Sequence, residues 1–149
     1  MTGFFQDSTD IKILLLFILN RMPEPTDTDT LLELAQCDGG ITYFDVADCL
    51  ASLVRTGHVS LDAGQYAILD KGRRDGGITE NSLPRSVRVR VERAVLGCVL
   101  RLRRDKMIAT SRTIRRRGGY SVELTLSEAG DELMQLRLYA VNQARAEEM

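Results

Sequence analysis

The spacing of apolar residues changes near Met107, and this change restricts the folds open to the 149-residue chain. Before Met107, apolar side chains mostly recur every three or four positions, which is the period of an α-helix. After it, apolar and polar residues alternate over 122–126 and again over 134–140, as they do in a half-buried β-strand. The pattern predicts an α+β protein whose last part is a three-stranded antiparallel sheet.

Three helices are predicted in the first 57 residues. Residues 8–10 offer an N-cap to the apolar segment IKILLLFILNRM, and Pro23 ends it. A short second helix lies in TDTDTLLELAQCDGG, where the glycine pair supplies a left-handed stop. Thr42 caps a third helix that ends before Gly57. The inward face of that helix holds Val46, Leu50, Leu53 and Val54.

A β-hairpin is predicted directly after these helices. Segments 58–61 and 65–69 alternate in polarity and flank the glycine-bearing turn Asp62-Ala63-Gly64. Three helices followed by a hairpin is the order of a winged helix, and the short gap between the second and third helices suits a helix-turn-helix. Residues 1–80 are therefore predicted to form an N-terminal winged helix-turn-helix domain.

Residues 81–149 form the second predicted domain. The polar, glycine-broken segment 70–82 is interpreted as a short helical turn and a linker. Ser82 and Pro84 then open a long linking helix that runs to about Met107, and its apolar stripe is wide enough to need two partners. The meander that follows is predicted at 108–117, 119–127 and 132–141, with a short terminal helix beginning in 142–149.

The charges of the two halves have opposite signs. Residues 1–80 hold six Lys/Arg against thirteen Asp/Glu, a formal charge of −7, whereas residues 81–149 hold fourteen against eight, or +6. A polyanionic partner is expected at the basic half, or on a dimer that joins two such stretches. The predicted basic patch comprises Arg101, Arg103, Arg104, Arg112, Arg115, Arg116 and Arg117. For the arginines at 101–104, one interpretation is that they simply make the outer face of the long helix soluble. The four at 112–117 are more than solubility requires, and they could meet nucleic acid or the acidic domain of a neighbouring subunit.

The third helix is the main candidate site, because the corresponding helix of a helix-turn-helix enters the DNA major groove. Hydroxyl donors and Arg55 suit phosphates and bases, whereas the two aspartates accept only from cytosine amino groups and are repelled by phosphate. The predicted DNA-contacting residues are Thr42, Tyr43, Asp45, Asp48, Ser52, Arg55, His58 and Gln65. The alternative is a helix that binds a protein or nothing.

Neither an enzyme, a metal site nor a cofactor is predicted. His58 is the single histidine and has no second His or Cys at ligand spacing, and no phosphate loop, nucleotide fingerprint or nucleophile elbow occurs. Cys37, Cys49 and Cys98 lie in apolar helical contexts, which indicates buried reduced thiols. The segment ILLLFILN is too short to span a membrane and no signal peptide is present, so a cytoplasmic location is expected.

Several segments together resemble a family of small, uncharacterised bacterial proteins with an N-terminal winged helix. They are IKILLLFILNRMPEP, ITYFDVADCLASLVRTGHV, YAILDKG, the Leu-Pro before the long helix, and GGYSVELTLSEAGDELMQLRLYAV. The resemblance implies a winged-helix regulator, similar in its first domain to PadR-type and MarR-type repressors, with a C-terminal module of unassigned role.

The leading hypothesis is a homodimeric transcriptional regulator that binds double-stranded DNA. The long helix is the expected dimer contact, with Phe4 and Phe5 packing near it. A different class remains open, in which the winged helix is a protein-interaction module without DNA binding. An effector pocket between the long helix and the sheet has no polar constellation to support it.

Overall fold

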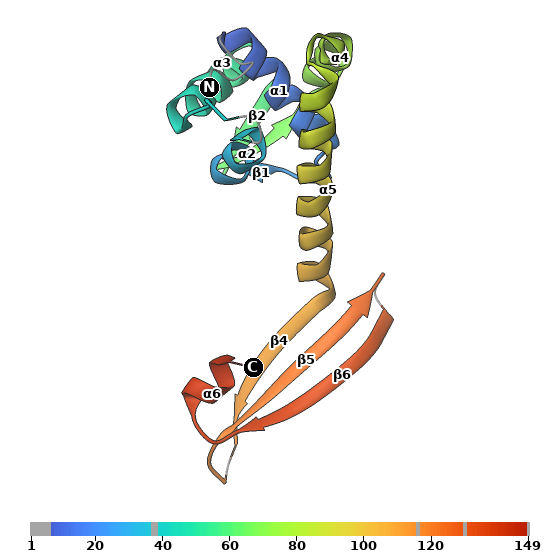
Figure 1. Ribbon diagram of the computed structural model, residues 1–149. Helices are drawn as coiled ribbons and strands as arrows, with labels where there is room; N and C mark the ends of the chain where they lie inside the picture. Colours follow the sequence, from blue (N-terminus) through green and yellow to red (C-terminus); the bar gives the residue numbers. More distant parts are fainter. Residues whose placement is uncertain (1–6, 37–38, 116, 130, 149) are drawn as a thin grey trace. The chain divides into compact units, whose positions relative to one another are not determined.

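The structure is a computed structural model that describes residues 7–36, 39–115, 117–129 and 131–148 (Figure 1). Phe4, Phe5, Cys37 and Arg116, which entered the predictions, lie outside these ranges. The described residues form six α-helices and two three-stranded antiparallel sheets, so the protein is a mixed α+β protein. Contacts divide the chain into two compact units, Met1–Val99 and Leu100–Met149.

Helix α1 (Ser8–Arg21) is the centre of the first unit. Its N-cap is Asp7, whose carboxylate accepts the Thr9 amide at 3.4 Å, so the cap lies one residue before the predicted 8–10. Seven of its residues are buried, as expected for a helix that is apolar on nearly every side. Helices α2 (Thr28–Ala35), α3 (Tyr43–Arg55) and α4 (Asp70–Thr79) all contact it.

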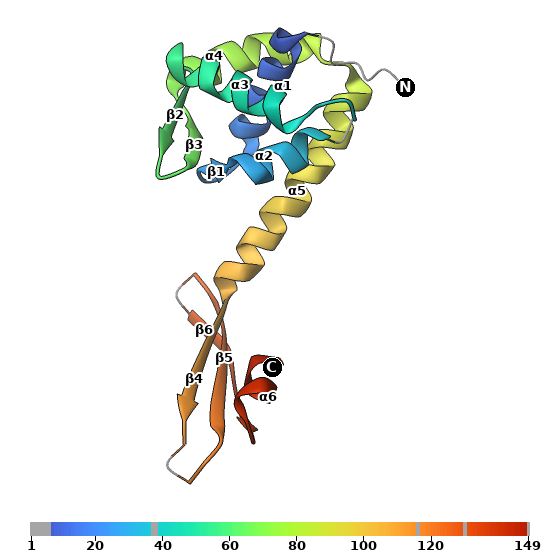
Figure 2. The ribbon, with the colours of Figure 1, turned by 90° about the vertical axis from the view of Figure 1, so that its left-hand side faces the viewer.

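The predicted hairpin exists and belongs to a larger sheet. Strands β2 (Val59–Asp62) and β3 (Gln65–Ile68) pair in register, and Figure 2 shows β2 leaving the end of α3. Strand β1 (Thr26–Asp27) pairs with β3 on its other edge, giving the order β1-β3-β2. The fold prediction contained one three-stranded sheet and a two-stranded hairpin. It was wrong because it missed β1, which makes the hairpin part of a second three-stranded sheet. Two residues are too few to show a period of two.

Helix α4 is longer than the helical turn predicted for 70–82, and it is followed by the 3₁₀ turn η2 (Glu80–Ser82). Its glycines explain the difference. A Cβ on Gly72 would lie 2.3 Å from the His58 carbonyl oxygen, and one on Gly76 would lie 3.3 Å from the Leu16 Cβ. Glycine therefore lets α4 approach α1 and the hairpin closely, and this packing outweighs its low helix propensity.

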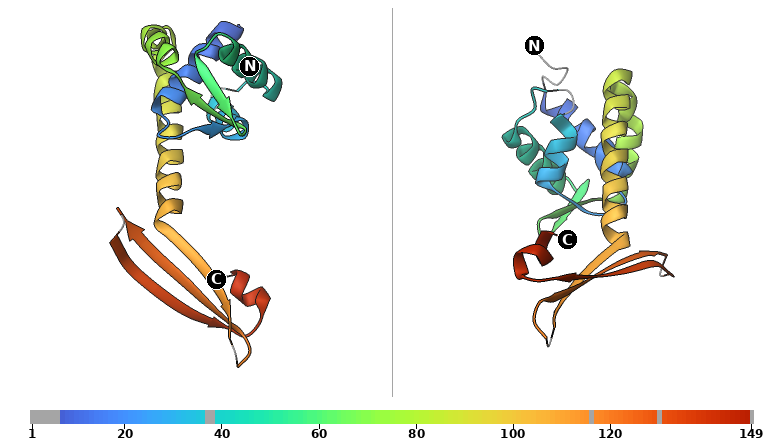
Figure 3. Two further views of the ribbon diagram at one scale, coloured as in Figure 1. Left: turned by 180° about the vertical axis from the view of Figure 1, so that it is seen from behind. Right: turned by 60° about the horizontal axis from the view of Figure 1, so that its bottom comes forward.

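Helix α5 (Arg85–Met107) has the predicted extent and lies beside α1 in two views (Figures 1 and 3). Its buried side consists of Val87, Val91, Val95 and Cys98. Arg21 at the end of α1 forms ion pairs with Glu80 at 3.5 Å and with Glu92 at 3.2 Å. These two pairs join α1 to η2 and α5. No helix in the described ranges is long and apolar enough to cross a membrane.

The second unit is the predicted meander. Strands β4 (Ile108–Ile114), β5 (Tyr120–Glu128) and β6 (Asp131–Ala140) lie in the order β4-β5-β6. Strand β4 ends three residues earlier than predicted, because the Arg115 amide donates to the Gly119 carbonyl and the chain turns there. Gly118 and Gly119 both have positive φ, which glycine adopts without strain. Helix α6 (Gln143–Glu148) follows, as expected from 142–149.

Candidate nucleic-acid interface

Helix α3 begins with a capping box. The Thr42 hydroxyl accepts the Asp45 amide at 3.2 Å, and the Asp45 carboxylate accepts the Thr42 amide at 2.9 Å. The Thr42 hydroxyl also lies 2.7 Å from the same carboxylate oxygen. The backbone hydrogen bond from Thr42, and then the one from its hydroxyl, lower the pKa of Asp45. Two residues predicted to contact DNA therefore stabilise the helix start in this structure.

The inward face of α3 is largely as predicted. Val46, Leu50 and Leu53 are buried, but Val54 is only half-buried. Cys49 is buried instead. It lies three residues after Val46 and therefore on the same side of the helix, whereas Val54 lies at the edge of that side. Both Cys49 and Cys98 are free and buried, as predicted.

The outward face of α3 is aromatic and acidic as well as polar. Phe44 is 77% exposed, and the Tyr43 ring meets it edge to face with 6.0 Å between centroids. Asp48 and Arg55 are exposed and Ser52 is half-buried. Phe44 was placed on this face by the sequence pattern but was not counted as a site residue. An exposed phenylalanine beside a tyrosine is a feature of binding surfaces, and its outward position was the available signal.

His58 forms hydrogen bonds with the end of α3, with α4 and with the end of the hairpin. It lies between α3 and β2, outside the strand that the sequence predicted for it. Its Nδ1 is 2.6 Å from the Thr56 hydroxyl, and its Nε2 is 2.8 Å from the Asp75 carboxylate in α4. Its carbonyl accepts the Leu69 amide at 2.9 Å. Both ring nitrogens thus have protein partners.

The hairpin offers polar contacts but no cation between Val59 and Ile68. Gln65 is exposed beside the turn, where Ala63 and Gly64 have positive φ. Lys71, at the start of α4, donates from its ammonium to the Thr56 carbonyl at 2.9 Å. Positive charge near the end of α3 therefore comes from Arg55 and Lys71.

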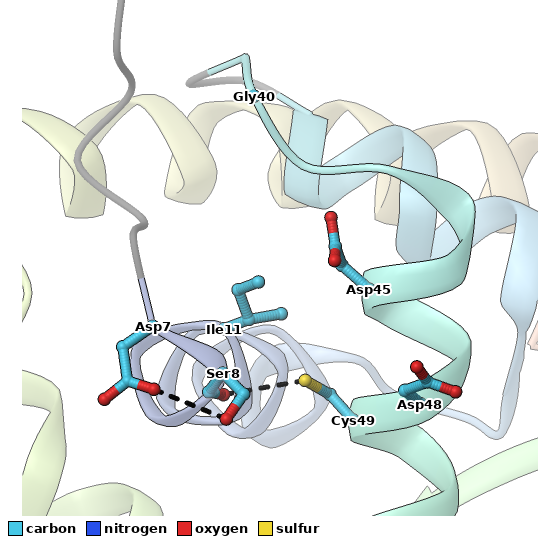
Figure 4. Close-up of a pocket in the computed structure, with 7 residues that line it drawn as sticks. All are labelled: Asp7, Ser8, Ile11, Gly40, Asp45, Asp48 and Cys49. Atoms are coloured by element: carbon cyan, nitrogen blue, oxygen red, sulfur yellow. Dashed lines mark hydrogen bonds between the residues drawn. The ribbon is translucent and has the colours of Figure 1, made fainter.

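A pocket of about 300 Å³ lies between the start of α1 and the first turns of α3 (Figure 4). Its lining includes the carboxylates of Asp7, Asp45 and Asp48. The Cys49 thiol donates to the Ser8 carbonyl at 3.5 Å, and burial raises its pKa, so the thiol stays protonated at neutral pH. Within the described ranges, no group of three or more His, Cys, Asp or Glu could hold a metal ion.

The predicted basic patch is not one continuous cluster within the second unit. Arg112 pairs with Glu147 of α6 at 3.3 Å, whereas the Arg115 guanidinium lies over the Tyr139 ring at 4.3 Å from its centroid. Arg112 is in register with Val122, and Tyr139 is in register with Ser121, so the two arginines serve opposite faces of the sheet. Arg101, Arg103, Arg104 and Arg117 are exposed.

The profile of the family described as domain of unknown function DUF4364 matches residues 11–149. The chain belongs to this family. The match includes α3, the hairpin and the β4–β6 sheet, so both units are part of what DUF4364 members share. No curated protein and no solved structure matches the chain. The expected membership in a domain-of-unknown-function family is confirmed.

Proposed function

We propose that this DUF4364 protein is a winged-helix transcriptional regulator that binds double-stranded DNA as a homodimer. The element order α1-β1-α2-α3-β2-β3, with the sheet order β1-β3-β2, supports a winged helix. The observation that carries the proposal is the position of α3. It packs inward through Val46, Leu50 and Leu53, and its opposite side is open next to the hairpin. In this arrangement the first unit would resemble PadR-type and MarR-type repressors.

The exposed side of α3 supplies a small set of DNA contacts. Arg55 can pair with a guanine edge or a phosphate, and Ser52 and Tyr43 can donate to either. Asp48 can accept from a cytosine amino group. Asp45 and Thr42 support these contacts by capping the helix. On the hairpin, the Gln65 side chain would contact the sugar-phosphate backbone of the DNA.

The homodimer is supported by the outer stripe of α5. Leu96 is 58% exposed, and Val89 and Leu100 are exposed on the same side, at spacings of seven and four. A helix face of this kind is covered when two copies pair along it. Two paired subunits would contact half-sites about one turn of DNA apart.

Binding is expected to depend on few phosphate contacts, because the first 80 residues hold six cations against thirteen acids. Each neutralised phosphate contributes a slope of about −0.9 in log K against log salt. With Arg55 as the one cation on the exposed side of α3, we expect a shallow slope of about −2 to −4 for the dimer.

A protein-interaction module is the second candidate, and the exposure of Phe44 beside Asp48 favours it. Aromatic side chains are frequent anchors of protein interfaces, whereas phosphate repels a nearby carboxylate. In this alternative the α3 face binds a basic, apolar segment of another protein, and DNA binding is absent.

Fluorescence anisotropy with labelled genomic DNA fragments at about 50 and 150 mM salt separates the two candidates. The regulator predicts saturable binding that Arg55→Ala weakens by roughly 5- to 100-fold, the effect of losing one base or phosphate contact. Arg74→Ala, which removes an exposed cation from α4, is the matched control and should change affinity little. Absence of saturable binding at the lower salt concentration would refute the regulator.

A further inference from the structure

The two faces of the β4–β6 sheet differ in composition. Residues in register across an antiparallel sheet share a face, and alternate positions along each strand return to it. One face, called the apolar face here, consists of four rows: Ile108, Leu126, Met134; Thr110, Leu124, Leu136; Arg112, Val122, Leu138; and Ile114, Tyr120, Ala140. The opposite face carries Ser121, Thr125, Gln135, Tyr139 and the Arg137–Glu123 ion pair.

Helix α6 covers only one end of the apolar face. Ala146 forms a buried cluster with Val122 and Ala140, and Tyr120 and Leu138 pack against it. The Arg112–Glu147 ion pair joins the helix to this end. Figures 1 and 3 show α6 at this end of the sheet. Helix α6 thus covers the part of the third and fourth rows that lies on β5 and β6, whereas Ile114 on β4 stays 75% exposed.

The first two rows remain open. Met134 is 50% exposed, Leu136 is 42% exposed and Ile108 is exposed as well. Leu124 and Leu126, at the centre of the sheet, are half-buried. An antiparallel sheet normally packs its apolar face against a core and leaves the polar one in water, and here two rows of the apolar face are in water as well. Adjoining exposed apolar side chains of this number are more typical of a binding surface than of a surface that stays in water.

The partner must be as uncharged as the rows themselves. The six positions carry five apolar side chains and Thr110, without a formal charge. A nucleic acid or a charged peptide would find no counter-charge there and would lose its own hydration. A second copy of the chain presents the same uncharged rows. A two-fold axis between them sets the first row of one sheet on the second row of the other, and both α6 helices stay outside the contact.

We propose that these two rows form a contact between two copies of this chain. The opposite face is mostly polar, and its exposed aromatic ring, Tyr139, already lies under the Arg115 guanidinium. A third copy would therefore find little apolar surface to cover, so association stops at two. The inference rests on one part of the proposed function, the homodimer. It assigns that homodimer a second contact besides the one along α5. It requires no DNA binding.

The test compares the solution mass of the full chain with two lysine variants of neighbouring residues on β6. Leu136→Lys places an ammonium in the contact, whereas Gln135→Lys places the same charge on the opposite face. Light scattering during size exclusion should give twice the chain mass for the native protein at about 20 µM, an ordinary concentration for a dimer of micromolar affinity. We expect Leu136→Lys to weaken the dimer on the order of 100-fold, since an unpaired buried charge opposes association. Gln135→Lys should stay within about threefold of the native protein.

Further variants keep the test decisive. Met134→Lys repeats the change in the neighbouring row in case Leu136→Lys does not fold, as judged by circular dichroism. A native monomer would overturn the inference. So would a dimer that survives both lysine variants and dissociates with Leu96→Lys on α5. Anisotropy on the same samples reports DNA binding separately, so a dimer without DNA binding refutes the regulator and leaves this contact standing.

Discussion

The central helix of the first unit and the central strand of the second differ in how completely they are covered. Helix α1 buries seven residues beneath α2, α3, α4 and η2. Strand β5 has the same alternation of apolar residues that a core strand has, yet among its residues only Val122 is buried. The first unit closes its core within one chain, whereas the second leaves half of its apolar sheet face exposed.

The largest expected effect sharpens this contrast. Phe17→Ala should lower the free energy of unfolding of the first unit by about 3–5 kcal/mol, because the ring is fully buried and also carries the Arg21 guanidinium 3.7 Å from its centroid. Leu136→Ala should cost the second unit below about 1 kcal/mol in dilute monomer, since the side chain is already open to water. Urea unfolding followed by residue-specific NMR signals measures both. Equal costs would remove the distinction.

The next effect concerns how tightly the first unit is packed. Gly72→Ala should destabilise it by about 1–3 kcal/mol, because the added methyl meets the His58 carbonyl at 2.3 Å. Gly77→Ala in the same helix has open space around it and should be neutral or stabilise by up to about 1 kcal/mol through helix propensity. Thermal unfolding of the pair gives the comparison. A neutral Gly72→Ala would mean that α4 does not approach the hairpin so closely.

The cap of α3 predicts a smaller, pH-dependent effect. Thr42→Ala should cost about 0.5–2 kcal/mol at neutral pH, as loss of an N-cap does. The pKa of Asp45 is lowered in the folded state, so its contribution is present above the unfolded pKa of about 3.9 and is lost as the pH falls below it. Asp45→Asn should therefore be less stable than the native protein at pH 7 and nearly equal to it at about pH 2. A constant difference across this range would contradict the assignment.

The smallest effect tests whether α6 is held firmly. Glu147→Gln removes the ion pair with Arg112, whose two side chains are both about half exposed. Such a pair contributes about 0–1 kcal/mol and is screened by salt. Hydrogen exchange of the α6 amides should accelerate by less than about fivefold, and less still at high salt. A larger acceleration would show that the pair, and not the Ala146 contact, holds the helix.

Much of the fold follows from local pattern. Thr42 and Asp45 stand three residues apart before an apolar run, which is the signature of a capping box, and the Asp62-Ala63-Gly64 turn predicts the hairpin. The period of two after Met107 predicts β5 and β6 to within one residue and the start of β4, but not the end of β4. Each of these features depends on neighbours within a few positions.

The remaining features depend on distant partners. Strand β1 exists because Thr26 and Asp27 meet Tyr66 and Gln65, and α4 is a helix because its glycines fit against other elements. In the candidate site, the outward face of α3 could be predicted from its period. The engagement of His58 by Asp75, seventeen residues away, could not, because nothing in the local sequence marks Asp75 as its partner.

The His58 ring has a mechanical consequence. It is in contact with the Thr56 hydroxyl at the end of α3 and with Asp75 in α4, while its carbonyl accepts an amide from the end of the hairpin. One residue thereby ties the hairpin to both helices. A shift of any of the three relative to the others has to stretch or break a hydrogen bond of His58.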